Sequence, residues 1–318
     1  MCVERMIEMK EIQKAIIVLP PYIRAKISSA LQSFSADVHD IVLRAERPVC
    51  VYIRNKQMYL TETGCLTDSL TSQKLIITSS QQILECFNNS CGYSVYSHIN
   101  EIKEGFITIG GGHRVGIAGT AVISAGLIHN IRDISTISIR ISRQIKGCAD
   151  RITNEYMNYR GGLLICGSPS SGKTTLIRDV ARLLSTDYAQ RVSVVDTRGE
   201  IASVCNGVCQ NDVGLCDVLD SYPRADGIIQ AVRSLSPQHI ICDEIGSPLD
   251  VEAILHGVNS GVRFVATVHA ENKEELLSRK SVRGILSTGA FEKVVFLSGR
   301  DKPCFINNSY AIEDFDCV

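Results

Sequence analysis

The residues with the clearest chemical signature form a glycine-rich run that ends in a lysine and two threonines. The run GSPSSGKTT, residues 167–175, contains the pattern G-x-x-x-x-G-K-[ST]. Glycines let such a backbone curl so that its N–H groups point at phosphate oxygens, and the helix that follows adds the positive end of its dipole. In this pattern Lys173 would reach the β- and γ-phosphates, and the Thr174 hydroxyl would bind Mg²⁺. The sequence therefore predicts a nucleotide site here rather than a simple Gly/Ser turn.

The flanking residues strengthen this prediction. The apolar run Leu163 to Cys166 precedes the glycines, and an amphipathic stretch from Thr175 to Leu184 follows the lysine. A strand, a loop and a helix in this order are the context that the pattern requires. We expect ATP and Mg²⁺ as cofactors. The residues expected to bind the nucleotide are Gly167, Ser168, Pro169, Ser170, Ser171, Gly172, Lys173, Thr174 and Thr175.

A second apolar run carries the carboxylates that such a site needs. Residues 240–242 are followed directly by Asp243 and Glu244. Asp243, together with Thr174, is predicted to hold Mg²⁺ and its water shell, and Glu244 to orient or deprotonate the attacking water. Acidic residues often follow buried strands without any chemical role. The functional interpretation of this pair therefore depends on the phosphate loop.

Two other apolar runs also end in polar residues. Asp196 and Glu200 follow the run at 192–195, and His269 follows the run at 264–268. The carboxyl ends of strands in an open α/β sheet face one crevice, so these side chains are expected beside the phosphate loop. An imidazole at His269 could sense the γ-phosphate. The alternatives are an Asp196 that only caps the next turn and a His269 with a structural role.

Two arginines are predicted to face the nucleotide. In ring ATPases an arginine from a neighbouring domain or subunit stabilises charge on the transferred phosphoryl group. Arg114 follows three glycines, where a tight turn would present it, and Arg140 lies on the polar face of a strand with isoleucines on its other face. Arg233 lies just before the second acidic run. The alternative for each is a surface or interface arginine.

The apolar runs also predict the architecture that positions these residues. In the C-terminal half, uninterrupted apolar strands alternate with helices, which indicates an α/β fold with a parallel sheet covered on both faces. The expected strands are Leu163–Cys166, Arg191–Asp196, Ile240–Asp243, Phe264–Val268 and Val294–Leu297.

The N-terminal half has the pattern of an α+β domain. Residues 1–36 are predicted to be helical with a break at Pro20 and Pro21, and an amphipathic stretch continues to about Phe34. Short β-rich runs follow at 41–43, 49–53, 106–109, 115–117 and 135–142, with a helix at about 80–88. We expect an N-terminal α+β domain over 1–143, a connecting helix or linker over 144–162, and an ATPase domain over 163–318.

Composition limits the class of protein. The 318 residues include 33 Lys and Arg against 34 Asp and Glu, so the net charge of −1 gives no reason to expect nucleic acid or an anionic membrane as partner. An odd number of cysteines, 13, in a long chain without a signal-peptide pattern indicates reduced thiols and a cytoplasmic location. No apolar run approaches the roughly 18 residues of a membrane-spanning helix. Any membrane association is expected to go through a partner or a surface.

These motifs together resemble the ATPases of type II and type IV secretion. That family carries a phosphate loop, an acidic box, a second acidic strand and a T-x-H-A box in this order. The matching segments are GSPSSGKTT, VVDTRGE, RSLSPQHIICDEIG and SGVRFVATVHA. The resemblance implies a RecA-like P-loop NTPase domain with a mostly parallel sheet. It makes Glu244 and Glu200 the candidates for activating water, without deciding between them.

The rest of the chain resembles a narrower family, that of stage III sporulation protein AA. The segments that carry this resemblance are 41–44 with 47–48, 111–116, 137–140, and 212–214 with 217–220. The resemblance implies an ATPase at the mother-cell membrane of a sporulating bacterium, acting with integral-membrane components of a secretion-like channel to the forespore. It also implies a homo-oligomer, a hexameric ring, held at the inner face of the membrane through partner proteins.

Three alternative functions stay open on the sequence. A nucleotide-dependent switch or scaffold with little turnover is the first, although the two candidate glutamates argue against it. A single-stranded nucleic-acid-binding ATPase would need a basic groove with aromatic platforms, and aromatic residues make up only 6% of the chain. A small-molecule kinase would need an acceptor pocket, for which the sequence carries no signal. The leading hypothesis is an oligomeric ATPase that powers or regulates a transport apparatus.

Overall fold

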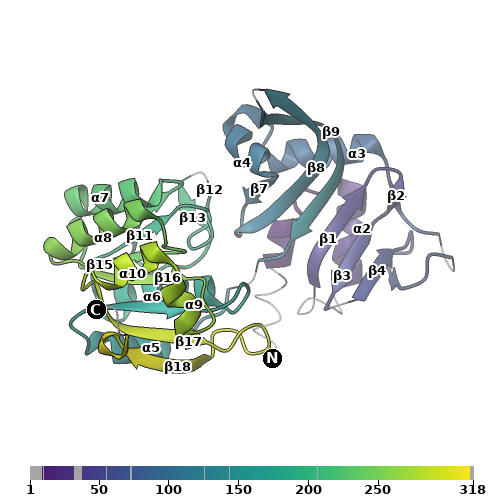
Figure 1. The fold of residues 1–318 in the computed structure, drawn as a ribbon. Coiled ribbons are helices and arrows are strands. Elements are labelled where there is room, and N and C mark those ends of the chain that lie inside the picture. The colour runs from purple at the N-terminus through teal and green to yellow at the C-terminus, as the bar shows by residue number, and fades with distance from the viewer. Residues whose placement is uncertain are drawn as a thin grey trace. The chain divides into compact units, whose positions relative to one another are not determined.

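The computed structural model describes residues 9, 11–31, 38–54, 56–71, 74–124, 126–142, 144–205 and 207–315. The chain divides into two compact units, Met1–Arg143 and Gln144–Val318 (Figure 1). Each unit has its own sheet and its own hydrophobic core. The expected division into domains over 1–143 and 163–318 with a linker over 144–162 stays a prediction.

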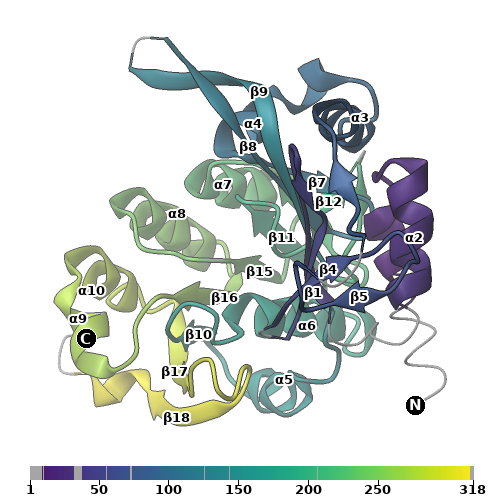
Figure 2. The same cartoon turned by 90° about the vertical axis from the view of Figure 1, so that its right-hand side faces the viewer.

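The N-terminal unit is built on a seven-stranded antiparallel sheet in the order β5-β4-β3-β1-β9-β8-β7. Its strands are β1 (Val38–Arg44), β3 (Cys50–Ile53), β4 (Lys56–Leu60), β5 (Leu66–Thr67), β7 (Phe106–Ile109), β8 (His113–Ser124) and β9 (Leu127–Arg140). A short ribbon pairs β2 (Arg47–Pro48) with β6 (Ile77–Thr78). In Figure 2 the β8–β9 hairpin extends well beyond the rest of this sheet.

Helices cover this sheet and close its core. They are α2 (Pro21–Leu31), α3 (Ser80–Ser90), η2 (Val95–His98) and α4 (Ile99–Glu104), and residues 11–16 are also helical. Pro21 is the first residue of α2, a position that tolerates proline because the missing N–H would have had no helical partner. The start of α3 is a capping box, in which Ser79 accepts a hydrogen bond from the Gln82 backbone and the Gln82 side chain accepts one from the Ser79 backbone.

The strands and the α3 helix expected in this half are present, but β8 runs from His113 to Ser124 where 115–117 was expected, and β9 runs from Leu127 to Arg140 where 135–142 was expected. The alternation expected near residue 140 is visible in β9, where Ile137 and Ile139 are buried and Arg140 is exposed. The amphipathic stretch expected to reach Phe34 is helical over Pro21–Leu31, and its residues 32–34 lie outside the described part. Residues 1–8 of the expected first helix also lie outside it.

The C-terminal unit has the α/β fold that the sequence predicted. Its seven-stranded sheet has the order β14-β11-β15-β16-β10-β17-β18, parallel throughout except for the pairing of β17 with β18. The strands are β10 (Gly162–Cys166), β11 (Val192–Asp196), β14 (Asp217–Asp220), β15 (His239–Cys242), β16 (Arg263–Val268), β17 (Phe291–Leu297) and β18 (Ile306–Ala311). A separate small hairpin joins β12 (Val204–Cys205) to β13 (Val208–Cys209).

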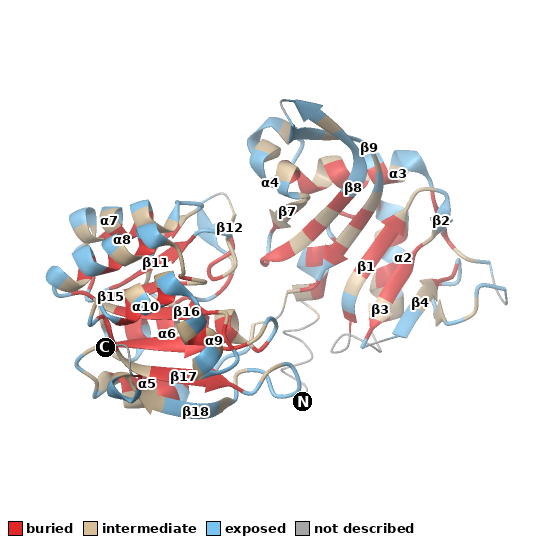
Figure 3. Cartoon of the chain, viewed as in Figure 1, coloured by how far each residue is buried: buried red, intermediate tan, exposed pale blue. Residues whose placement is uncertain are grey.

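Helices lie on both faces of this sheet, as Figure 2 shows. The helices are α5 (Asp150–Met157), α6 (Lys173–Thr186), α7 (Arg224–Ser234), α8 (Pro248–Asn259), α9 (Lys273–Ser278) and α10 (Lys280–Leu286), followed by η3 (Ile312–Asp314). Neighbouring strand residues belong to opposite cores: Leu163 packs with α5 and α6, and Leu164 packs with α7 and α8. The central strands are therefore buried on both faces (Figure 3), which explains their uninterrupted apolar sequences.

Two features of this unit differ from the sequence-based expectation. The edge strands β14 and β18 were not expected, because their sequences DVLD and INNSYA are too polar to read as buried strands. The helix expected over 144–162 is confined to Asp150–Met157. Gly147 has a left-handed φ of 81°, and the side chains of Gln144 and Lys146 are tied to Asp212 at 2.8 and 2.6 Å, so tertiary contacts hold this stretch out of a helix.

Within the described residues, no helix combines the length and the apolarity that crossing a bilayer requires.

A buried polar cluster lies at the amino ends of the parallel strands. His239 is fully buried, with Nδ1 2.9 Å from the Tyr156 hydroxyl and Nε2 3.1 Å from an Arg263 nitrogen. Because Arg263 can only donate, Nε2 accepts and Nδ1 carries the proton. Burial and the Arg263 charge lower the pKa of His239 to about 4, so the imidazole is neutral at physiological pH.

This cluster predicts that the C-terminal unit loses stability in mild acid. An unfolded histidine binds its proton near pH 6.5, whereas folded His239 binds it only near pH 4, so folding is penalised as pH falls between these values. At 1.36 kcal/mol per pH unit, the free energy of unfolding should fall by about 3 kcal/mol across this range. Urea unfolding at pH 7 and pH 4.5 measures the change.

The matched control is His256→Gln, at an exposed position on α8. It should leave the acid sensitivity in place, whereas His239→Gln should lower stability at pH 7 and flatten its dependence on pH. Equal pH dependence in the His239 variant and the parent chain would contradict this assignment.

Candidate functional site

The phosphate loop lies between β10 and α6, as its sequence predicted. Gly172 has φ 92°, and a Cβ there would lie 2.6 Å from the Cys304 backbone nitrogen, so both its conformation and its surroundings require glycine. That same nitrogen donates a hydrogen bond of 2.9 Å to the Ser171 carbonyl. At Gly167 a Cβ would lie 2.5 Å from Ser171 Oγ. The loop is therefore supported from outside by a distant segment and has no room for side chains at its two glycines.

Lys173 points back across the mouth of this loop. Its Nζ donates to the carbonyls of Gly167 and Ser168, each at 2.9 Å, and lies 3.0 Å from Nδ1 of His269. Burial lowers the pKa of Lys173, and the charges of Asp243 and Glu244 oppose this effect. The ammonium group is thus already desolvated and directed at the place where phosphate oxygens would bind.

One hydroxyl in the loop is evidence that the loop binds a polar ligand. Ser171 Oγ is buried and finds no hydrogen-bond partner among the described residues. Buried polar groups are normally paired, and an orphan in a binding loop calls for an explanation. A phosphate held by the loop backbone would fit, since the glycines leave the cradle unfilled by side chains.

Thr174 and Asp243 bring two hard oxygen ligands together. The Thr174 hydroxyl donates to Oδ2 of Asp243 at 2.6 Å, joining the first turn of α6 to the end of β15. The other carboxylate oxygen, Oδ1, accepts hydrogen bonds from the Thr267 hydroxyl and, at 3.0 Å, from the Glu244 backbone. A hydroxyl beside a carboxylate is a donor set that suits Mg²⁺, which takes few protein ligands and keeps several waters. The residues therefore fit the predicted metal.

Glu244 is held on both sides. Its Oε1 lies 2.7 Å from Nε2 of His269, and its Oε2 lies 2.5 Å from an Arg198 nitrogen. The Lys173 ammonium can only donate a hydrogen bond, so Nδ1 of His269 accepts it. The ring proton of His269 is therefore on Nε2, which donates a hydrogen bond to Glu244. Burial raises the pKa of Glu244, but the His269 hydrogen bond and the positive charges of Arg198 and Lys173 outweigh it and lower the pKa.

Asp196 has a structural role in the turn that follows β11. It is buried, and its carboxylate accepts backbone hydrogen bonds from Glu200, Ile201 and Ala202 at 2.8–3.0 Å. Burial raises the pKa of Asp196 against the effect of these three donors. The expected alternative, an Asp196 that caps the next turn, is the arrangement observed.

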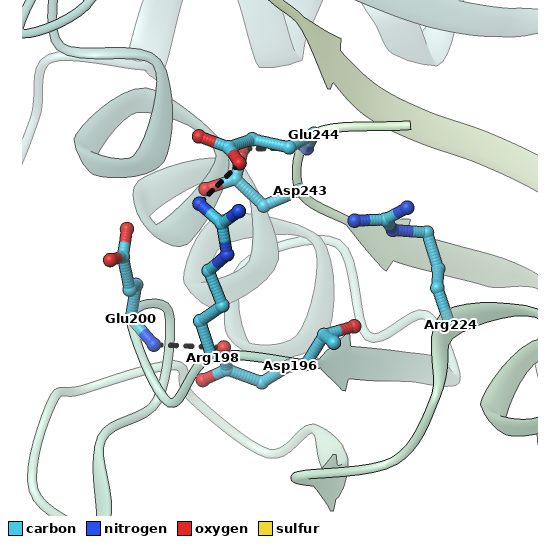
Figure 4. Close-up of a pocket in the computed structure, with 7 residues that line it drawn as sticks. Asp196, Arg198, Glu200, Arg224, Asp243 and Glu244 are labelled. Carbon is cyan, nitrogen blue, oxygen red and sulfur yellow. Dashed lines mark hydrogen bonds and ion pairs between the residues drawn. The ribbon is translucent and has the colours of Figure 1, made fainter. Parts of the chain in front are cut away.

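Glu200 lines a pocket together with Asp243 and Glu244. Figure 4 shows this pocket, with Glu200 and Glu244 on two sides of the Arg198 side chain. The pocket is lined by Asp196, Thr197, Arg198, Glu200, Arg224, Asp243 and Glu244. Arg198 and Arg224 were not expected there. Arg198 lies in the segment VVDTRGE, which the sequence analysis singled out. However, no sequence pattern links Arg198 to Glu244, its partner in the structure.

We predict that Asp196→Asn destabilises the C-terminal unit, because the Asp196 carboxylate holds the turn after β11. An amide presents one acceptor oxygen where the carboxylate presents two, so buried backbone N–H groups lose partners, at a cost of about 2 kcal/mol. The urea midpoint of the variant should fall. Asp217→Asn, at an exposed position of the neighbouring strand β14, should leave it unchanged. An Asp196 variant with full stability but no activity would point instead to a catalytic role.

The two expected arginines lie in the N-terminal unit. Arg114 in β8 is directly opposite Arg140 in β9, which is in turn opposite Asp40 in β1. Arg140 Nε lies 3.2 Å from the Asp40 carboxylate, and the Arg114 guanidinium lies over the Phe106 ring at 4.5 Å. The two arginines are therefore cross-strand neighbours in this sheet. Their expected contact with nucleotide stays a prediction.

Comparison with known proteins points to one family. Residues 9–314 match the family described as sporulation stage III, protein AA. Stage III sporulation protein AA of Bacillus subtilis (strain 168) is 34% identical over 299 residues, covering 92% of this chain and 93% of the relative.

Solved structures show where the fold recurs. The ATPase DotB of Yersinia pseudotuberculosis aligns with a TM-score of 0.54 at 16% identity, over 87% of this chain and 75% of DotB. The pilus retraction motor PilT, solved with bound ADP, aligns with a TM-score of 0.50 at 14% identity, over 81% of this chain and 74% of PilT. At these identities the similarity concerns the fold alone.

Proposed function

The chain belongs to the sporulation stage III protein AA family, and we propose that it is a Mg²⁺-dependent ATPase that powers or regulates a membrane transport apparatus during sporulation. The observation that carries the proposal is the meeting of Thr174 and Asp243 at 2.6 Å directly beside the desolvated ammonium of Lys173.

Each residue has a distinct role in this proposal. The loop amides and Lys173 bind the phosphates, and Thr174 with Asp243 holds Mg²⁺. When bound, the metal neutralises charge on the phosphates. Glu244 takes the proton of the attacking water. His269 donates to Glu244 and contacts Lys173, so it couples the orientation of the base to the position of the phosphate-binding lysine.

The choice of Glu244 over Glu200 as base rests on position. Glu244 adjoins the metal ligand Asp243, and its backbone is fixed by a hydrogen bond of 2.9 Å to the Thr267 hydroxyl. It also has a left-handed φ of 53°, which is uncommon for a residue other than glycine and is often found at functional sites. Glu200 stays the alternative.

One observation favours a second candidate, the nucleotide-dependent switch with little turnover. Each carboxylate oxygen of Glu244 already has one partner, His269 or Arg198, so an attacking water would have to share the carboxylate with both. Steady-state release of inorganic phosphate from ATP by the full chain distinguishes the two functions. Mg²⁺-dependent turnover that chelation abolishes supports the ATPase, and nucleotide binding with background-level release supports the switch.

We further propose a homo-oligomeric ring that acts at the inner face of the membrane through integral-membrane partners. The support for this comes from family membership and from the resemblance to secretion ATPases. Molar mass measured by light scattering, with and without Mg²⁺-ATP, is the test. A monomer under both conditions would count against a ring.

A further inference from the structure

Arg198 occupies the apex of the turn between Asp196 and Glu200. The turn is anchored on its inner side by the buried Asp196 carboxylate. On its other side, Arg178 donates to the carbonyls of Glu200 and Ile201 at 2.6 and 2.7 Å. The backbone that carries Arg198 is thus fixed from both ends, and the long side chain reaches across the pocket to Glu244 (Figure 4).

The Arg198–Glu244 ion pair is short but easy to exchange. The Arg198 side chain is 64% exposed, against 24% for Glu244. Exposed ion pairs contribute little to stability, because water screens the charges and the side chains lose freedom. A terminal phosphate, with more negative charge and a geometry that matches a guanidinium, would compete well for the same side chain.

The second arginine of this pocket is not available for such an exchange. Arg224 pairs with Asp250 at 3.0 Å, and the two side chains are only 16% and 2% exposed. The Asp250 carboxylate also accepts the backbone N–H groups of Gly246 and Ser247, which ties Arg224 to the start of α8. Breaking a buried pair is expensive, so Arg224 is expected to keep its place.

We propose that Arg198 is an intrachain sensor of the γ-phosphate, which leaves Glu244 and binds the terminal phosphate when ATP occupies the loop. The proposal rests on the proposed ATPase function and explains how Glu244 becomes usable. Without a γ-phosphate, Arg198 occupies one oxygen of Glu244, and this restrains the base. With ATP bound, Oε2 of Glu244 is released to accept the proton of water, while His269 still holds Oε1. ADP lacks the group that draws Arg198 away, so the base returns to its restrained state after each turnover.

The test compares two nucleotides that differ by the terminal phosphate. Isothermal titration measures the affinity of the full chain for Mg²⁺-ADP and for the non-hydrolysable analogue Mg²⁺-AMP-PNP. Arg198→Ala should weaken AMP-PNP binding about tenfold, the worth of one charge-assisted contact, and change ADP binding less than about twofold. Arg198→Lys, which keeps the charge without the planar fork, should lie between the two. Arg279→Ala, which removes an exposed pair with Glu275 on α9, should change neither affinity.

Each outcome decides the proposal. Equal weakening of both nucleotides in Arg198→Ala would mean that Arg198 only shapes the loop. Two unchanged affinities would mean that Arg198 does not contact the γ-phosphate. Either result overturns the sensor. Failure of the underlying function looks different, because the unmodified chain would then bind neither nucleotide, or bind both and release no phosphate.

Discussion

Replacing Lys173 with alanine is expected to reduce ATP turnover by at least about a hundredfold and to weaken Mg²⁺-ATP binding strongly. Lys173 is buried, and its ammonium is held by two loop carbonyls at 2.9 Å, so the unmodified protein has already met most of the cost of desolvating it. A preorganised charge of this kind acts on phosphate oxygens with little reorganisation. The variant loses that charge and leaves the two carbonyls without their donor.

Two further variants make this result interpretable. Lys173→Arg keeps a positive charge but brings a larger planar group into a loop whose glycines leave no spare room, so it should also lose most of the activity. Lys280→Ala, at an exposed position that begins α10, should keep full activity. Phosphate release and titration with AMP-PNP measure the two effects separately. Equal turnover in the Lys173→Ala variant and the parent chain would remove the basis for the proposed function.

Replacing Glu244 with glutamine is expected to lower kcat by about two to four orders of magnitude while leaving AMP-PNP affinity within about threefold. The amide has nearly the shape of the carboxylate, but it has one acceptor oxygen, so it can accept a hydrogen bond from only one of the two donors His269 and Arg198, and it cannot take a proton from water. Because the change is confined to the proton-transfer step, kcat should fall and binding should not.

Glu200→Gln is the natural comparison, since both residues line one pocket. It should lower kcat by less than about tenfold if Glu244 is the base. The reverse order of effects would assign the base to Glu200 and leave Glu244 as a partner of Arg198 and His269. Single-turnover phosphate release by the two variants gives the comparison directly.

Much of the C-terminal fold could be predicted because its signals are local. Each central strand is buried on both faces and is therefore apolar throughout, as in Leu163 to Cys166. The edge strands β14 and β18 lack this signal, since each has a neighbour on only one side and carries polar residues. The helix expected over 144–162 is shortened to α5 for another reason: contacts to Asp212, more than sixty positions away, hold residues 144–146 out of the helix.

By itself, the sequence determined which residues form the glycine-rich loop between a strand and a helix and which strand ends carry carboxylates, because both depend on short patterns with a direct physical meaning. Only the tertiary structure decided how those side chains pair. The sheet places β16 between β15 and β10, which puts His269 between Glu244 and Lys173. It also places β11 beside β15, which brings Arg198 to Glu244. Strand order arises from hydrogen bonds between apolar segments far apart in the chain. The apolar patterns of these segments are too similar to indicate which strands lie side by side.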